Sequence, residues 1–235
     1  KIKFIKGEIS NFKITEKKDL EYTKKLLDYN ENNMRIGNGF DVHKFTDGNL
    51  LTLLGVKIPF KRKLEGHSDA DVGIHSIVDS LLGAISEGDI GNHFPPTEKK
   101  WKNKNSEYFL EYTKKLIDSQ NYKINNIDIT IICEEPKISN FKEKMRKKIS
   151  KILKIDINKI NIKGTTTEKL GFLGRKEGIA CQTISLISKI DDLVDKMKNN
   201  PPDSLDTVPE DTTVSYRDMI EKQAKQIGRL QLKYG

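Results

Sequence analysis

The sequence has few cysteines, few aromatic residues and no long apolar run. Its 235 residues include two cysteines and one tryptophan, and aromatic side chains make up 7% of the chain. Cys133 and Cys181 are too few for a disulfide scaffold and lack metal-site spacing, so we expect buried free thiols in a reducing compartment. No apolar stretch approaches the ~18 residues that a membrane span needs. These absences argue against a disulfide-stapled fold and predict no membrane partner.

The chain is basic, but its charge is dispersed. Lys and Arg number 42 against 34 Asp and Glu, which gives a net charge of +8 and a mean hydropathy of −0.61. Such a balance suits nucleic acid, an anionic membrane or a phosphorylated substrate. The lysines are mixed with Asn and Ile, as is typical of a solvated surface, and no aromatic and basic interleaving indicates a single-strand binder. We expect no nucleic-acid partner; a basic, non-enzymatic nucleic-acid-binding protein is the alternative, which a steep salt dependence of binding would support.

Composition divides the chain into three parts. Residues 1–33 are rich in Lys and Asn, and we expect a poorly ordered leader or a trimmed transit segment. Residues 34–188 have the patterning of a folded domain. Residues 189–235 include a linker rich in Pro, Asp, Ser and Thr, followed by a helical or disordered tail.

Apolar periodicity predicts the elements of the central part. We expect strands over 34–45 and 51–60 with a turn between them, helices over 68–88, 106–120 and 139–153, and strands over 125–136, 160–165 and 178–188. The last strand is apolar enough to be buried on both faces. The order predicts an α+β domain, a mixed sheet with helices packed on one face. The other face would then need a cover, and a homo-oligomer is one solution.

Three residues predict a metal site. Asp41 and His43 are two positions apart in a strand, so both point to the same face. His75 lies in the next helix, and Asp71 one turn earlier is a suitable acceptor for its second ring nitrogen. Three protein ligands with a fourth position open are typical of catalytic zinc. The alternatives are an exposed polar pair at a strand end and an ordinary core or surface histidine.

Two turns carry further candidate groups. The stretch "KGTTTEKLGF" offers hydroxyl and N–H donors that suit a phosphate, and the Glu168 carboxylate suits Mg²⁺ or Mn²⁺. Its alternative is a helix cap, with Thr165 as N-cap and Glu168 three residues on. In "GDIG" two glycines bracket Asp89, and the alternative there is a helix C-terminal turn.

These stretches together resemble a known family. "RIGNGFDVHKF", "GHSDADVGIH", "GDIG", "KGTTTEKLGF" and "GRKEGIAC" are similar, in order and spacing, to the signature blocks of the 2-C-methyl-D-erythritol 2,4-cyclodiphosphate synthases, across residues 34–188. The resemblance implies a phosphorus–oxygen lyase of the non-mevalonate isoprenoid pathway. It would convert 4-diphosphocytidyl-2-C-methyl-D-erythritol 2-phosphate to the 2,4-cyclodiphosphate with release of CMP. It also implies a homotrimer with active sites between subunits.

The resemblance further implies a role for each matching residue. Zn²⁺ would be held by Asp41, His43 and His75, the first two also contacting substrate. A second cation, Mg²⁺ or Mn²⁺, would be held by Glu168, which would also contact substrate. His67 and Thr166 would stabilise the transition state. The remaining substrate contacts are the phosphates at His67 and Ser68, the methylerythritol hydroxyls at Asp89 and Gly91, the cytidine at Cys133, Pro136, Lys137, Thr165 and Thr166, and the trimer-axis cavity at Phe172 and Arg175.

The sequence also departs from the family pattern. Pro96 stands where an acidic residue is usual, and Asn38 replaces a frequent histidine. Glu134 and Glu135 add negative charge beside the expected nucleotide pocket. A metal-dependent phosphohydrolase, in which metal-bound water attacks phosphorus, is the alternative enzyme. The Lys/Asn-rich leader suggests the stroma of an apicoplast-like, plastid-type organelle, with a bacterial cytoplasm as the alternative.

Overall fold

The computed structural model describes residues 17, 34–66, 69–101 and 104–190. The predictions for the leader over 1–33, apart from residue 17, and for the tail beyond residue 190 lie outside the described residues. Within the described ranges, no helix is long and apolar enough to cross a membrane.

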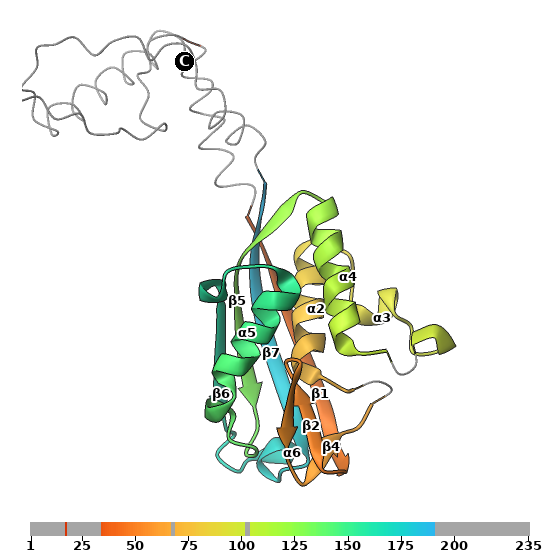
Figure 1. The fold of residues 1–235 in the computed structure, drawn as a ribbon, viewed down its shortest axis with the longest axis vertical. Helices are drawn as coiled ribbons and strands as arrows, with labels where there is room; N and C mark the ends of the chain where they lie inside the picture. The colour runs from red at the N-terminus through yellow and green to blue at the C-terminus, as the bar shows by residue number, and fades with distance from the viewer. Residues whose placement is uncertain (1–16, 18–33, 67–68, 102–103, 191–235) are drawn as a thin grey trace, which may run out of the picture. The chain divides into compact units, whose positions relative to one another are not determined.

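A five-stranded mixed sheet organises residues 34–190 (Figure 1). Its order is β4 (Arg62–Leu64), β1 (Met34–Asp47), β7 (Gly178–Lys189), β5 (Tyr122–Ile132) and β6 (Ile160–Thr165). Only β5 and β6 are parallel; the other neighbours are antiparallel. Three longer helices, α2 (Val72–Ala84), α4 (Ser106–Ser119) and α5 (Lys142–Leu153), lie on one face of the sheet (Figure 1). The predicted α+β class with helices on one face is confirmed.

Shorter elements complete the chain order. They are β2 (Leu50–Leu53), β3 (Val56–Pro59), α3 (Ile90–His93), α6 (Gly171–Gly174) and the 3₁₀ turns η1 (Lys99–Trp101), η2 (Ile138–Asn140) and η3 (Ile157–Lys159). The prediction of one strand over 51–60 is wrong. The segment folds back on itself as the β2–β3 hairpin, because Leu54 and Gly55 adopt positive φ values of 49° and 73° and turn the chain. The strand that pairs with the end of β1 is β4.

Two glycines let α2 lie directly on the sheet. A Cβ atom at Gly37 would stand 1.8 Å from the carbonyl oxygen of Ser80, and one at Gly39 would stand 2.0 Å from that of Ser76. The same two serines bond to β7, Ser76 Oγ to Thr183 Oγ1 at 2.7 Å and Ser80 Oγ to Ser185 Oγ at 2.6 Å. The close approach places the start of α2 beside the middle of β1.

The two faces of the sheet differ in burial. The apolar core lies between the sheet and the helices, with side chains such as Ile129, Leu81 and Leu110 fully buried. On the opposite face Ile36, Phe40 and Ile184 are 71%, 55% and 46% exposed. The prediction that the last strand is buried on both faces is confirmed for its first four residues, Gly178–Cys181, which are all buried. It is wrong further along the strand, where Gln182 and Ile184 are exposed in the single chain.

Candidate functional site

Asp41, His43 and His75 converge at the junction of β1 and α2. Asp41 Oδ2 lies 3.1 Å from His43 Nε2 and 3.0 Å from His75 Nδ1, and the two ring nitrogens are 3.3 Å apart. Ligands about 2.0–2.1 Å from a tetrahedral metal would stand roughly 3.3 Å from one another. The triangle of donor atoms is thus nearly the size that such an ion requires, and the donor set of two imidazoles and a carboxylate suits zinc.

Both histidines have an acceptor on the nitrogen that faces away from this triangle. His43 Nδ1 donates to the backbone carbonyl of Glu65 at 2.7 Å, because a carbonyl oxygen can only accept. His75 Nε2 lies 3.0 Å from the hydroxyl of Ser106, the first residue of α4. With those nitrogens protonated, His43 Nε2 and His75 Nδ1 keep free lone pairs directed at the centre.

Asp41 is held in its ionised form. Burial would raise the pKa of this carboxyl, but hydrogen bonds and charge interactions with His43 and His75 outweigh burial and bring the pKa well below its usual value. Its other oxygen, Oδ1, accepts a hydrogen bond from the backbone N–H of Val42 at 2.8 Å. The side chain is therefore an anionic ligand at neutral pH.

Asp71 does not support His75, and that prediction is wrong. Its fully buried carboxylate is the N-cap of α2 and accepts from Ile74 N at 3.0 Å. It also accepts from Leu54 N at 2.8 Å and Gly55 N at 2.6 Å, which fastens the β2–β3 turn to the helix. Burial raises the pKa of this carboxyl, and the three N–H donors oppose the rise. The partner of the second ring nitrogen of His75 is Ser106 and not Asp71.

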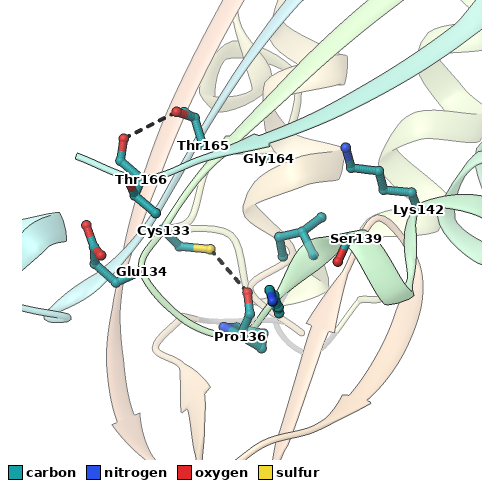
Figure 2. A pocket seen from close by; sticks show the side chains of 10 residues that line it. Cys133, Glu134, Pro136, Ser139, Lys142, Gly164, Thr165 and Thr166 are labelled. Carbon is teal, nitrogen blue, oxygen red and sulfur yellow. Dashed lines mark hydrogen bonds between the residues drawn. The ribbon is translucent and has the colours of Figure 1, made fainter. Parts of the chain in front are cut away.

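A pocket of about 280 Å³ lies between the ends of β5 and β6 and the start of α5. Figure 2 shows Thr165 and Thr166 on one side of it and Ser139 and Lys142 on the other. The five residues predicted to form a nucleotide pocket all line it: Cys133, Pro136, Lys137, Thr165 and Thr166. Ser139 and Lys142 were not predicted from the sequence; they approach the pocket because η2 turns the chain between β5 and α5.

The two cysteines are free and buried, as predicted. Cys133 is in the wall of the pocket, and its thiol donates weakly to the carbonyl of Pro136 at 3.7 Å (Figure 2). Burial, and then the charge of Glu134, raises the pKa of Cys133 to about 12. Burial likewise raises the pKa of Cys181 to about 12. Both thiols are protonated at neutral pH, so neither is an activated nucleophile.

Glu134 organises the loop that follows β6. Its Oε1 atom accepts from the backbone N–H groups of Thr167 at 3.1 Å and Lys169 at 3.2 Å. Glu168 and Lys169 have φ values of 53° and 65°, a conformation that costs non-glycine residues free energy. The negative charge of Glu134 is thus used to hold a strained turn.

The same loop sets the position of Glu168. Thr166 Oγ1 donates to Glu168 Oε1 at 2.9 Å, so the two side chains lie together beside the pocket. The alternative in which Thr165 caps a helix is wrong, because the next helix, α6, begins only at Gly171 with Leu170 as its N-cap. Glu135, the other carboxylate that departs from the family pattern, forms ion pairs with Lys176 at 2.7 Å and Lys61 at 3.7 Å.

Among the described residues, the other predicted site residues, Asp89, Gly91, Phe172 and Arg175, belong neither to the triad nor to the pocket lining. Asp89 is the N-cap of α3 in a reciprocal capping box with Asn92, so the alternative of a helix C-terminal turn does not apply to it. Gly91, in the same short helix, is exposed. Phe172 on α6 is 43% exposed, and Arg175 donates to Glu177 at 2.6 Å. His67 and Ser68 lie outside the described residues, so their predicted roles are untested.

Comparison with known proteins gives consistent matches. The model of the YgbB family matches residues 34–188. The curated bifunctional enzyme IspD/IspF of Wolbachia pipientis wMel is 48% identical over 191 residues, which cover 79% of this chain and 48% of that protein. The enzyme of the same name from Bartonella bacilliformis is 49% identical over 182 residues, or 76% of this chain and 46% of the relative. The chain therefore spans about half the length of the curated relatives it matches.

Solved structures of IspF and IspDF also match this chain. The CDP complex of IspF from Plasmodium falciparum is 44% identical, with a TM-score of 0.61, and the match covers 68% of this chain and 99% of that one. The bifunctional IspDF from Campylobacter jejuni is 41% identical, with a TM-score of 0.63, and the match covers 81% of this chain and 51% of that one.

Proposed function

Because this chain belongs to the YgbB family, as its sequence motifs predicted, we propose that residues 34–188 act as a 2-C-methyl-D-erythritol 2,4-cyclodiphosphate synthase. The relatives include enzymes of this type, which are lyases of isoprenoid biosynthesis. The observation that carries the proposal is the convergence of Asp41, His43 and His75 on one point. A pocket with the predicted cytidine contacts in the same domain supports it.

The proposed reaction is an intramolecular phosphoryl transfer. An oxygen of the 2-phosphate forms a bond to the β-phosphorus of 4-diphosphocytidyl-2-C-methyl-D-erythritol 2-phosphate. The bond from that phosphorus to the bridging oxygen breaks, and CMP leaves with the electron pair. Because the substrate supplies the nucleophile, the protein needs to position two groups and neutralise charge. This requirement fits a site without an activated cysteine.

We assign the triad to Zn²⁺ and Glu168 to a second cation, Mg²⁺ or Mn²⁺. The family is metal-dependent, and the nitrogen-rich triad suits zinc whereas a lone carboxylate beside phosphates suits a harder ion. Zinc at the triad would polarise a phosphate oxygen and make phosphorus more electrophilic. Lys137 and Lys142 line the pocket and would balance the charge of the diphosphate. The hydroxyls of Thr165 and Thr166 would donate to substrate oxygens.

We also propose a homotrimer. The exposed apolar side chains of β1 and β7, among them Ile36, Phe40 and Ile184, form one continuous sheet face because Phe40 pairs with Gln182 and Asn38 with Ile184. Burying such a face against other copies would remove a large apolar area from water. In this assembly the triad of one subunit would approach the pocket of the next, and Phe172 and Arg175 would line a cavity on the axis.

We also propose a cellular compartment for this protein. The curated relatives from Wolbachia and Ruegeria are bacterial, which favours the bacterial cytoplasm over the plastid-type organelle for this chain. Similar solved structures come from Plasmodium as well. Immunolocalisation of the protein in its source cells would decide between the two compartments.

Phosphorus NMR of the reaction tests the proposed activity. With a divalent cation present, we expect the cyclic diphosphate and CMP in equal amounts. A linear monophosphate product would instead support the metal-dependent phosphohydrolase, in which metal-bound water attacks phosphorus. Failure of the protein to turn over the cytidine diphosphate substrate would contradict both.

A further inference from the structure

A chain of hydrogen bonds leads away from His75 on the side opposite the triad. His75 Nε2 lies 3.0 Å from Ser106 Oγ, and the Ser106 hydroxyl contacts Asp69 Oδ1 closely. The same carboxylate oxygen accepts from the backbone N–H of Ser106 at 3.2 Å. Ser106 is fully buried, and the His75 side chain is 14% exposed. The three residues come from α2, the start of α4 and the segment before α2.

The direction of this chain follows from the chemistry of its members. An ionised carboxylate only accepts, so the hydroxyl proton of Ser106 points at Asp69. The Ser106 oxygen then has lone pairs available to accept from His75 Nε2–H. With the ring proton on Nε2, the lone pair of His75 is on Nδ1, which faces Asp41 Oδ2 at 3.0 Å and His43 Nε2 at 3.3 Å.

From this arrangement we propose that Ser106, oriented by Asp69, is a positioning residue that holds His75 in the tautomer and rotamer required for metal binding. The inference rests on the proposed function only in taking the triad as a metal site. Outer partners of this kind typically change metal affinity by ~10–100-fold when they are removed.

A different interpretation of the same atoms is a nucleophilic triad. Asp41, His75 and Ser106 have the order and spacing of an acid, base and serine nucleophile. Three observations oppose it. The Ser106 side chain is fully buried, and its proton is directed at Asp69 rather than at His75. In addition, His43 Nε2 lies beside His75 Nδ1, and an acid–base–nucleophile arrangement does not use a second histidine there. The geometry favours the metal ligand.

The test compares Ser106→Ala with Ser119→Ala in the full chain. Ser119 is at the other end of α4, exposed, and its hydroxyl donates to the carbonyl of Leu116, so it is a matched control. Zn²⁺ affinity is measured by competition with a chromophoric chelator, and the ligand field by the visible absorption of the Co²⁺-substituted protein. We expect Ser106→Ala to weaken Zn²⁺ binding ~10–100-fold and to shift the Co²⁺ bands, with Ser119→Ala unchanged.

A second variant keeps the test decisive if Ser106→Ala does not fold. Asp69→Ala removes the acceptor of the Ser106 proton, which then becomes free to donate to His75 Nε2 and favours the wrong tautomer. Weakened Zn²⁺ binding in a variant whose metal-free melting temperature is unchanged would support the proposal. Wild-type affinity in either folded variant would overturn it. Covalent labelling of wild-type Ser106 by a fluorophosphonate would also overturn it, in favour of the nucleophilic triad.

The outcomes for the two proposals are separable. If the wild-type protein bound neither Zn²⁺ nor Co²⁺ at micromolar concentrations, the metal site of the proposed function would fail, and with it the premise of this inference. If the wild-type protein bound the metal and Ser106→Ala bound it equally well, only the inference would fail.

Discussion

Asp41 Oδ2 lies 3.0 Å from His75 Nδ1, although the two residues are 34 positions apart in the sequence. One is on β1 and the other on α2, and the helix can approach the strand this closely because Gly37 and Gly39 have no side chains. His43 joins them from the next position on the same face of β1. The donor triangle is therefore a product of helix-on-sheet packing, and several consequences can be measured.

The first prediction concerns the triad itself. His75→Ala removes one of three converging donors, so we expect a loss of Zn²⁺ affinity greater than the ~10–100-fold typical of an outer partner, and a corresponding loss of turnover. Inductively coupled plasma mass spectrometry after dialysis measures the bound metal. His93→Ala is the control, because that ring bonds to the carbonyl of Glu87 outside the triad. A His75→Ala protein that retained one zinc per chain would contradict the assignment.

The Glu168→Gln substitution should distinguish the two proposed cation sites. The side chain keeps its size and a hydrogen-bond acceptor for Thr166, but it loses the charge that suits Mg²⁺ or Mn²⁺. We expect turnover to fall strongly while zinc remains bound at the triad. Phosphorus NMR measures the product, and metal analysis of the same sample measures zinc. Full turnover in this variant would show that the proposed second cation site is wrong.

Glu134 and Glu135 are adjacent carboxylates with different expected effects. Glu134→Ala removes the acceptor for two backbone N–H groups of the strained loop that carries Thr166 and Glu168. We expect kcat/KM to fall about tenfold, since hydrogen bonds to a charged group contribute roughly 1.5–3 kcal/mol. Glu135→Ala removes only exposed pairs with lysines and should change kcat/KM less than about twofold. Equal effects of the two substitutions would refute the role of Glu134.

Two glycine substitutions test the packing of α2. Gly37→Ala would place a methyl group 1.8 Å from the Ser80 carbonyl oxygen, and we expect a loss of at least ~1–3 kcal/mol in the free energy of unfolding. Gly83→Ala is the matched control in the helix itself, where the nearest atom to a new Cβ would be 3.9 Å away. It should stabilise the protein by roughly 0.5–1 kcal/mol. Urea denaturation at equilibrium measures both, and a neutral Gly37→Ala would contradict this account of the close approach.

The last prediction concerns assembly. We expect multi-angle light scattering to give a trimer for the full chain and for a truncated protein that ends at Ser188. Phe40→Asp places a charge on the exposed apolar face of β1 and should give a monomer. A monomeric wild-type protein would contradict the proposed trimer. A trimer lost only when residues 204–235 are removed would assign assembly to the C-terminal tail.

The sequence by itself determined the local features of this protein. Alternation with a period of two placed Asp41 and His43 on one face of β1, and helical periodicity placed His75 on α2. The order and spacing of the motifs were enough to indicate the family. These features could be predicted because the side-chain directions within one strand or one helix follow from positions only a few residues apart.

Only the tertiary structure decided which partners these residues have. Asp71, four positions before His75, was the predicted partner, yet it caps the helix, and the partner of His75 is Ser106, 31 positions away on α4. Glu134 likewise bonds to a loop 33 to 35 positions further on. Such contacts depend on how separate elements pack. That packing is set by the steric fit of whole surfaces, such as the two glycines under α2, and not by the periodicity of any one segment.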